Sequence, residues 1–215
     1  MNQSRVHRMR ATRAVKAKQR YHTQMEIILA SRSPRRLTLL QSAGLAVEVQ
    51  PSHIDETPFP GEPVNAMVKR LSREKAIACN APAGMPVVAA DTLVAIGKHV
   101  LGQPRDLRHA KTMLKQLSGA EHQVITGVCV RLNDRLMQQH VATHVRFRTV
   151  STDEIETYLA HNDVLDKAGG YAVQGGAASF IESITGPLDN VIGLPVRTTL
   201  DMLAELRALQ TNETG

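Results

Sequence analysis

The stretch PVVAADTLVAI, residues 86–96, is the most apolar run in the chain and predicts a buried β-strand. Only Asp91 and Thr92 interrupt it, and Gly97-Lys98 supplies turn residues after it. A carboxylate inside such a strand is costly to bury unless a partner offsets its charge. The interruption therefore predicts either a functional carboxylate beside a metal ion or a catalytic water, or an aspartate that caps a neighbouring backbone turn.

Before this strand, the sequence predicts a strand–helix–strand unit and then a long helix. Residues 26–30 form a short apolar run and residues 45–50 alternate, as strands do, and Gly44 can end the intervening helix in a left-handed conformation. Residues 63–80 carry apolar side chains at helical spacing. Lys75 lies on the same apolar stripe, so its ammonium group must either reach solvent or meet an anion.

After this strand, the sequence predicts two more helices, a hairpin and a glycine-rich region before the last helix. The expected elements are a helix from Asp106 to Gly119, strands near 121–132 and 135–148 joined by Asn133-Asp134, a helix from the capping box Ser151/Glu154 to about His161, a glycine-rich region with short strands over 162–194, and a helix from Pro195 to about Gln210. Helices and strands intermingle without strict alternation, which favours an α/β fold with a mixed, twisted sheet flanked by helices.

The positive charge of the chain lies in its first 24 residues. Residues 1–24 contain seven basic and no acidic residues, and subtracting this +7 from the net charge of +6 leaves the remainder at −1. With three Tyr, three Phe and no Trp, the chain has few aromatic rings on which bases could stack, so we expect no dedicated nucleic-acid domain. We expect a basic, disordered extension over 1–24, with transient RNA or membrane contact as the alternative, a single domain over 25–210 and a flexible tail over 211–215.

The composition also bears on location and metal type. No apolar run approaches the about 20 residues that a membrane-spanning helix needs, and residues 1–24 lack the apolar centre of a signal peptide, so we expect a cytoplasmic protein without membrane contact. Cys79 and Cys129 lie in an expected helix and strand, which indicates packing rather than a disulfide or metal site. The nine histidines show no ligand spacing, so zinc is not expected.

Three further groups of polar residues could bind a phosphorylated ligand. Residues 31–36, SRSPRR, surround the start of a helix, where free N–H groups attract anions, although Ser33 could merely cap the helix and the arginines could be solvated. The loop acids Asp55 and Glu56 are ligands of the type that magnesium shares with phosphates, or simply solvated. Residues 166–176, DKAGGYAVQGG, allow close backbone approach and contain a lysine, although such loops also occur for structural reasons.

Seven short motifs, collinear along residues 26–206, together resemble the Maf family of nucleoside triphosphate pyrophosphatases. The motifs are LASRSPRR (29–36), DET (55–57), RLSREKA (70–76), ADT (90–92), LSGAEH (117–122), DKAG (166–169) and VIGLP (191–195). Each motif alone is weak evidence. Their order along the folded chain makes the resemblance specific.

The resemblance implies hydrolysis of a nucleoside triphosphate to the monophosphate and pyrophosphate by a homodimer, with a divalent cation such as magnesium or manganese. It implies a fold similar to that of Maf and ITPase enzymes, with two lobes around a central cleft. Asp91 would be the proton acceptor that activates water for attack on the α-phosphorus, and Glu56 and Asp91 would hold the metal. The side chains implied to bind substrate are Ser31, Arg35, Arg36, Lys75, Thr92, Gln103, Lys167 and Gln174.

Three of these positions indicate the substrate branch. Arg36, Thr92 and Gln174 are similar to the branch acting on dTTP and UTP, and modified pyrimidine nucleotides are compatible with it, whereas the 7-methyl-GTP branch typically carries Trp, Gln and Glu. The alternatives are a pyrophosphatase for 7-methyl-GTP or non-canonical purine nucleotides, and a cell-division regulator that acts by binding alone.

The sequence departs from the family pattern at Gln103, where a lysine usually precedes the proline. A glutamine can still hydrogen-bond a phosphate, but the positive charge is gone. The resemblance therefore predicts weaker triphosphate binding at this position, or a compensating contribution from Lys98 or Arg105.

Overall fold

Seven strands form one mixed sheet in residues 24–211, the part of the chain that the computed structural model describes. The strands are β1 (Glu26–Leu29), β2 (Ala46–Val49), β3 (Val87–Ile96), β4 (His99–Leu101), β5 (Glu121–Leu132), β6 (Arg135–Phe147) and β7 (Ile181–Thr185). The helices are α2 (Pro34–Ser42), α3 (Val64–Ala78), α4 (Leu107–Leu117), α5 (Thr152–His161), α6 (Leu188–Ile192) and α7 (Val196–Thr211), with short 3-10 helices at Ala168–Gly170 and Gly176–Phe180. Apart from residues 24 and 211 themselves, the expected extension over 1–24 and the expected tail over 211–215 lie outside the described residues.

The strand order is β2-β1-β3-β5-β6-β7, with β4 paired to β3. β1 runs parallel to β2 and β3, while β3, β5, β6 and β7 pair antiparallel in sequence, so the predicted mixed sheet is confirmed. β1 pairs with β3 only at Val87 and Val88, and β4 pairs with β3 only from Val94 onward. Between these two pairings, Asp91 and Thr92 lie on a part of β3 that is open on one edge.

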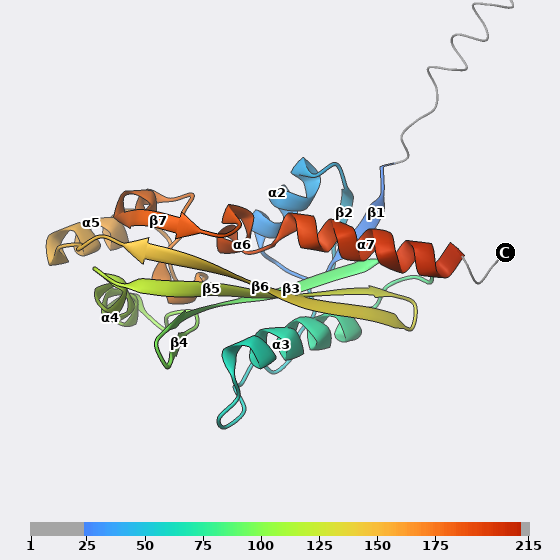
Figure 1. The fold of residues 1–215 in the computed structure, drawn as a ribbon, viewed down its shortest axis with the longest axis horizontal. Coiled ribbons are helices and arrows are strands. Elements are labelled where there is room, and N and C mark those ends of the chain that lie inside the picture. Colours follow the sequence, from blue (N-terminus) through green and yellow to red (C-terminus); the bar gives the residue numbers. More distant parts are fainter. Residues whose placement is uncertain (1–23, 212–215) are drawn as a thin grey trace, which may run out of the picture.

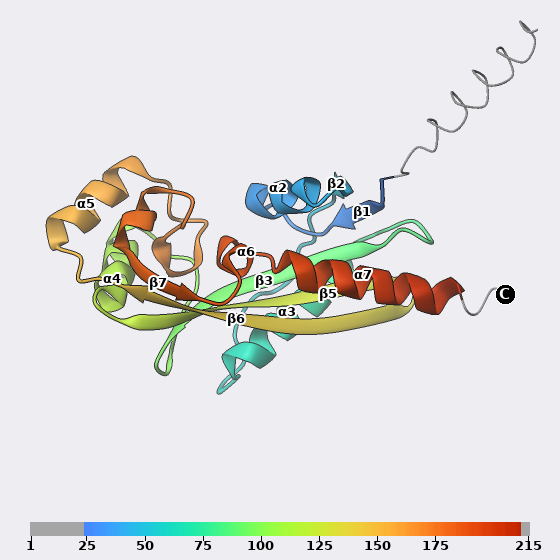
Figure 2. The same ribbon diagram turned by 45° about the horizontal axis from the view of Figure 1, so that its top comes forward.

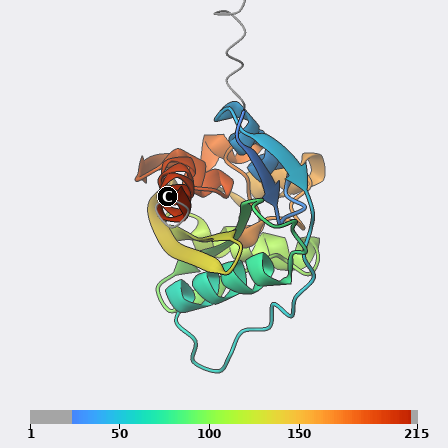
Figure 3. The same cartoon turned by 90° about the vertical axis from the view of Figure 1, so that its right-hand side faces the viewer.

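Two long helices cover opposite faces of the central strands (Figures 1 and 3). α3 packs on β3 and β5, and α7 packs on β5 and β6 of the other face. α3 lies against the sheet because its apolar residues recur at helical spacing, and Met67, Val68, Leu71 and Ala76 are all buried. Lys75 lies four positions after the buried Leu71, on the same face of the helix, so its side chain is close to the sheet.

The elements separate into two lobes that share β3, β5 and β6 (Figure 2). The first lobe contains β1, β2, α2, α3 and α7, and the second contains α4, α5, β7 and the two 3-10 helices. Val128 of β5 packs in the core of the first lobe, and Val124 of the same strand packs in the core of the second. The predicted two-lobed α/β fold is confirmed.

Three predicted helix starts are confirmed, and local side-chain caps determine them. Ser33, Asp106 and Ser151 accept hydrogen bonds from backbone N–H groups at the starts of α2, α4 and α5, and Ser151 forms the predicted capping box with Glu154. Gly44 follows α2 with a φ of +87°, as expected for a left-handed helix end.

The prediction of short strands over residues 162–194 is only partly correct. This region contains one strand, β7, and otherwise consists of the two 3-10 helices and the five-residue helix α6. α6 depends on tertiary contacts, since the buried amide of Asn190 donates to Val124 O (3.0 Å) and Thr143 Oγ1 (3.0 Å) on β5 and β6. The three-residue strand β4 was not predicted either.

Cys79 and Cys129 are free and buried, and burial raises the pKa of Cys129 to about 12, which keeps its thiol protonated. None of the helices in residues 24–211 is long and apolar enough to cross a membrane.

Candidate active site

A cleft of about 340 Å³ lies between the two lobes and is lined by every residue that the family resemblance implied for the site. Its walls come from the loop after β1, the start of α2, α3, the open part of β3, and the segments 166–174 and 191–193. The predicted residues that line it are Ser31, Arg35, Arg36, Glu56, Lys75, Asp91, Thr92, Gln103, Lys167 and Gln174.

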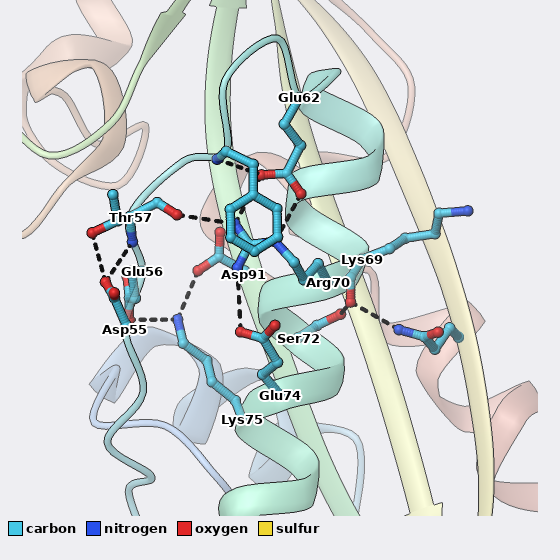
Figure 4. A network of polar contacts seen from close by, with 12 residues as sticks. Asp55, Glu56, Thr57, Glu62, Lys69, Arg70, Ser72, Glu74, Lys75 and Asp91 are labelled. Atoms are coloured by element: carbon cyan, nitrogen blue, oxygen red, sulfur yellow. Dashed lines mark hydrogen bonds and ion pairs between the residues drawn. The ribbon is translucent and has the colours of Figure 1, made fainter.

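Asp91, Lys75 and Glu56 form a charged chain at the base of the cleft (Figure 4). Lys75 Nζ lies 2.7 Å from Asp91 Oδ1 and 2.9 Å from Glu56 Oε1. The Asp91 side chain is 9% exposed and that of Glu56 is 56% exposed, so the lysine joins a buried carboxylate to one at the surface. The prediction that Lys75 meets an anion is confirmed.

The second oxygen of Asp91 has no partner among the described residues. Asp91 Oδ2 is buried and accepts no hydrogen bond there, while Oδ1 accepts one from Lys75. A buried carboxylate oxygen without a partner is costly. This oxygen is therefore suited to a group that enters with the ligand, such as a cation or a water molecule.

The approach of α3 to Asp91 depends on Gly127, which is paired with Asp91 across β3 and β5. A Cβ atom at position 127 would lie 2.2 Å from Val68 O and 2.9 Å from Lys69 N, both on α3. Only glycine allows the helix backbone to lie this close to the strand, and this contact brings Lys75 within reach of Asp91. The prediction missed this role, although a lone glycine inside a strand often marks a close backbone approach.

On the other face of β3, Arg36 joins the start of α2 to Thr92. Its guanidinium donates to Ser31 Oγ (3.1 Å), Thr92 Oγ1 (3.1 Å) and Gly193 O (2.8 Å). Burial lowers the pKa of Arg36, and the negative charge of Asp91 acts in the opposite direction. The alternative that this arginine is simply solvated is wrong, whereas the expectation that Ser33 caps the helix is confirmed.

Asp166 links cationic side chains from the two lobes across the cleft. Its carboxylate lies 3.1 Å from Arg35 Nη1 on α2 and also pairs with Lys167 Nζ. Burial works to raise the pKa of Asp166, but the hydrogen bonds and charges of Lys167 and Arg35 outweigh it and hold that pKa below its ordinary value. The site prediction did not include the Asp166 side chain.

The site prediction also missed Tyr171, in the wall of the cleft, and His122, which contacts it. His122 Nε2 is 2.7 Å from Tyr171 Oη, and Tyr171 lines the cleft. Burial lowers the pKa of His122 to about 4, so its ring is neutral at physiological pH. This hydrogen bond, with the ring of Phe147 packed edge-on against both, stiffens the wall.

The family model for Maf-like proteins matches residues 26–206, the span that carries these cleft residues. The chain belongs to the Maf family. It is 45% identical to the dTTP/UTP pyrophosphatase of Anaeromyxobacter dehalogenans (strain 2CP-C), over 82% of this chain and 92% of that relative. It is also 45% identical to the dTTP/UTP pyrophosphatase of Geobacter sulfurreducens, over 85% of this chain and 97% of that relative.

Among solved structures, the Maf-family chain has a partial likeness to a nucleoside-triphosphatase / dITP/XTP pyrophosphatase from Mycobacterium abscessus. The identity is 18% and the TM-score is 0.37, over 59% of this chain and 76% of that one.

The two adjacent acids of the Maf motif DET lie in different surroundings. Glu56 lines the cleft and pairs with Lys75, whereas Asp55 is exposed and accepts hydrogen bonds from Thr57 N (2.9 Å) and Thr57 Oγ1 (2.6 Å). These hydrogen bonds lower the pKa of Asp55. The pair therefore offers one carboxylate to the cleft, and the other closes a turn.

The cleft side chains of this Maf protein fit a cation that is shared with phosphates. Within residues 24–211 there is no group of three or more His, Cys, Asp or Glu side chains arranged to hold a metal ion. Three carboxylates from this part of the chain line the cleft: Asp91, with its unpaired Oδ2, Glu56, which pairs with Lys75, and Asp166, which pairs with Arg35 and Lys167. Asp91 and Glu56 share Lys75 as a partner, so these two lie close enough together to hold one cation. Magnesium is commonly bound by one or two carboxylates together with substrate phosphates, and this donor set matches that arrangement.

The two basic residues that could compensate for the missing charge at Gln103 do not line the cleft. Gln103 lines the cleft and donates from Nε2 to the backbone oxygen of Asp166 (3.3 Å). Neither Lys98 nor Arg105 is among the lining residues, and the backbone N–H of Arg105 donates to His109 Nδ1. The position that carries a lysine in the family pattern is thus neutral here.

Proposed function

We propose that this protein hydrolyses dTTP and UTP, and modified pyrimidine nucleotides of similar shape, to the monophosphate and pyrophosphate in the cleft between its lobes. The observation that carries the proposal is the buried, unpaired Oδ2 of Asp91 in a cleft lined by Arg35, Lys75 and Lys167. The names of the relatives, which are 45% identical over most of the chain, support the same substrates.

Asp91 is the proposed general base. Its Oδ1 is held by Lys75, so Oδ2 is free to take a proton from a water molecule as the water oxygen attacks the α-phosphorus. The bond between the α-phosphorus and the bridging oxygen breaks, and pyrophosphate leaves. Arg35, Lys75 and Lys167 oppose the negative charge of the triphosphate during this displacement.

Asp91 and Glu56 are the proposed ligands of a divalent cation, magnesium or manganese. When bound, the cation would supply positive charge to the phosphate oxygens in the transition state. Lys75 contacts both carboxylates and holds them close together before the substrate binds.

We propose that the nucleobase of the substrate is selected by Arg36, Thr92 and Gln174. Arg36 is immobilised by hydrogen bonds to Ser31, Thr92 and the backbone of residue 193, so these side chains form a rigid part of the cleft. Thr92 is held further by a hydrogen bond to Thr126 (2.9 Å). The amide of Gln174 can both donate to and accept from the edge of a pyrimidine.

A panel of nucleotides tests this function. The purified chain is incubated with magnesium and dTTP, UTP, CTP, 7-methyl-GTP or dITP, and the released pyrophosphate is measured. We expect the highest kcat/KM for dTTP and UTP. A higher value for 7-methyl-GTP or dITP would move the protein to another substrate branch, and no release from any nucleotide would favour a regulator that acts by binding. The homodimer and the cytoplasmic location stay predictions.

Gln103→Lys is expected to lower the KM for dTTP between about threefold and tenfold, because a charge-assisted hydrogen bond to phosphate contributes about 0.7 to 1.4 kcal/mol at an exposed position. The added ammonium group would join Arg35 and Lys167 at the neutral position described above. Steady-state kinetics with dTTP measure the effect, with the α,β-imido analogue of dTTP as competitor because its α–β bridge resists hydrolysis. Gln103→Met is the control, since it removes the amide without adding charge and should not lower KM. An unchanged KM in Gln103→Lys would contradict the prediction.

A further inference from the structure

The segment between β2 and α3 runs along the outside of α3 without any helix or strand of its own (Figures 1 and 3). Glu56 belongs to this segment. Residues 55–61 are all exposed, so this segment has little apolar packing to hold it in place. Glu56 nevertheless reaches the cleft and pairs with Lys75. Something other than packing must therefore fix its position.

Arg70 on α3 contacts this segment at three places (Figure 4). Its guanidinium donates to both oxygens of Glu62, from Nε at 2.7 Å and from Nη2 at 2.8 Å, and Nη2 also donates to the backbone oxygen of Thr57 at 3.2 Å. The ring of Phe59 lies against the same group, with its centroid 4.0 Å from the guanidinium carbon. The side chain of Arg70 is 16% exposed and that of Glu62 is 9% exposed, so the two-point ion pair is shielded from solvent.

The restraint passes from Arg70 to Glu56 through one residue. Thr57 follows Glu56 directly, and its backbone oxygen is held by Arg70, while its N–H and hydroxyl are held by Asp55. Glu56 thus lies in a turn that is closed by the hydrogen bonds between Asp55 and Thr57 and is bound to α3 by Arg70. Arg70 and Lys75 belong to the same helix, so α3 fixes both the turn and the partner of the Glu56 carboxylate.

We propose that Arg70 is a positioning residue for the reaction: it clamps residues 55–62 to α3 so that Glu56 stays beside Asp91 and is ready to share a cation with it. The inference rests on the proposed function. Arg70 is absent from the residues that line the cleft and acts through the backbone of Thr57. Its ion pair with Glu62 is intact at neutral pH, because the hydrogen bonds from Arg70 hold the pKa of Glu62 below its usual range.

The test compares four variants of the full chain. Arg70→Met removes every contact of the guanidinium, Arg70→Lys keeps the charge but not the planar fork, and Glu62→Gln weakens the ion pair while the arginine stays. Arg73→Met is the matched control, because Arg73 is an exposed arginine on the same helix. Amide hydrogen exchange of residues 55–62, binding of Mn²⁺ measured by electron paramagnetic resonance with a non-hydrolysable dTTP analogue, and dTTP turnover are measured for each.

In Arg70→Met, we expect faster exchange of residues 55–62, binding of Mn²⁺ weakened by about tenfold and kcat lowered by about tenfold, as for other residues that orient metal ligands. The KM for dTTP should change little, since the side chains proposed to bind the phosphates, Arg35, Lys75 and Lys167, stay in place. Arg70→Lys should recover part of the loss, Glu62→Gln should reproduce part of it, and Arg73→Met should behave as the wild type. If Arg70→Met does not fold, Glu62→Gln carries the test.

Two results would overturn the proposal. One is faster exchange of residues 55–62 with unchanged Mn²⁺ binding and turnover, which would make the clamp irrelevant to Glu56. The other is unchanged exchange in both Arg70→Met and Glu62→Gln, which would mean that the segment is held by other contacts. Failure of the proposed function gives a different result, namely no pyrophosphate from the wild type, and the exchange and Mn²⁺ measurements still decide whether Arg70 positions Glu56.

Discussion

Asp91→Asn is expected to lower kcat for dTTP by about 10²-fold to 10⁴-fold, the range typical of losing a general base. The amide cannot take a proton from water, and it is also a poorer ligand for a cation than a carboxylate. The fold should survive, because Lys75 keeps its ion pair with Glu56 and so does not become an unpaired buried charge. Single-turnover release of pyrophosphate from dTTP measures the chemical step directly, and the melting temperature checks the fold.

Asp134→Asn is the matched control for the lost negative charge. Asp134 is an exposed aspartate in the turn between β5 and β6, and it does not line the cleft. Its kcat should equal that of the wild type. A loss of less than about tenfold in Asp91→Asn would exclude Asp91 as the base, because a general base contributes at least about 10²-fold.

Gly127→Ala is expected to lower the free energy of unfolding by about 3 kcal/mol or more, at the upper end of what overpacking costs. The new methyl group would lie 2.2 Å from Val68 O, and a backbone oxygen inside a helix cannot move aside as a flexible side chain can. The helix as a whole must shift away from β5. Because Lys75 is on this helix, the variant should also lose activity through a longer distance between Lys75 and Asp91.

Thermal unfolding measures this effect, and a loss of 3 kcal/mol corresponds to a fall in Tm of roughly 6 to 12 °C for a chain of this size. Gly102→Ala is the control, since a Cβ atom there would meet nothing within 4 Å and the glycine has no positive φ. A Tm for Gly127→Ala within about 1 °C of that for Gly102→Ala would show that α3 can move away from β5 at little cost.

The features that could be predicted from the sequence are those determined by residues close together in the chain. Ser33, Asp106 and Ser151 cap helices through contacts three residues away, and the Asn133-Asp134 turn joins two antiparallel strands that follow each other directly. The cleft residues were found because short motifs of the Maf family carry them.

The features that escaped prediction depend on residues far apart in the chain. Periodicity indicates that one face of α3 is buried, but it does not indicate that the helix lies against Gly127. The clamp at Arg70 needs Thr57 and Glu62 to fold back over α3, and Asp166 meets Arg35 only once the two lobes face each other. α6 and β4 are too short to give a periodic signal and exist because of the strands beside them.

The continuity of β3, β5 and β6 through both lobes limits how the cleft can move. Two-lobed proteins often close by rotation about a few loop residues that absorb the change in backbone angles. Here the lobes are joined by three neighbouring strands, and β5 and β6 remain hydrogen-bonded from Glu121 to Leu132. We therefore expect any opening or closing to occur by bending and twisting of the sheet, which would spread the strain over many hydrogen bonds and keep the amplitude small. The flexible element of the cleft is then a continuous sheet and not a few hinge residues.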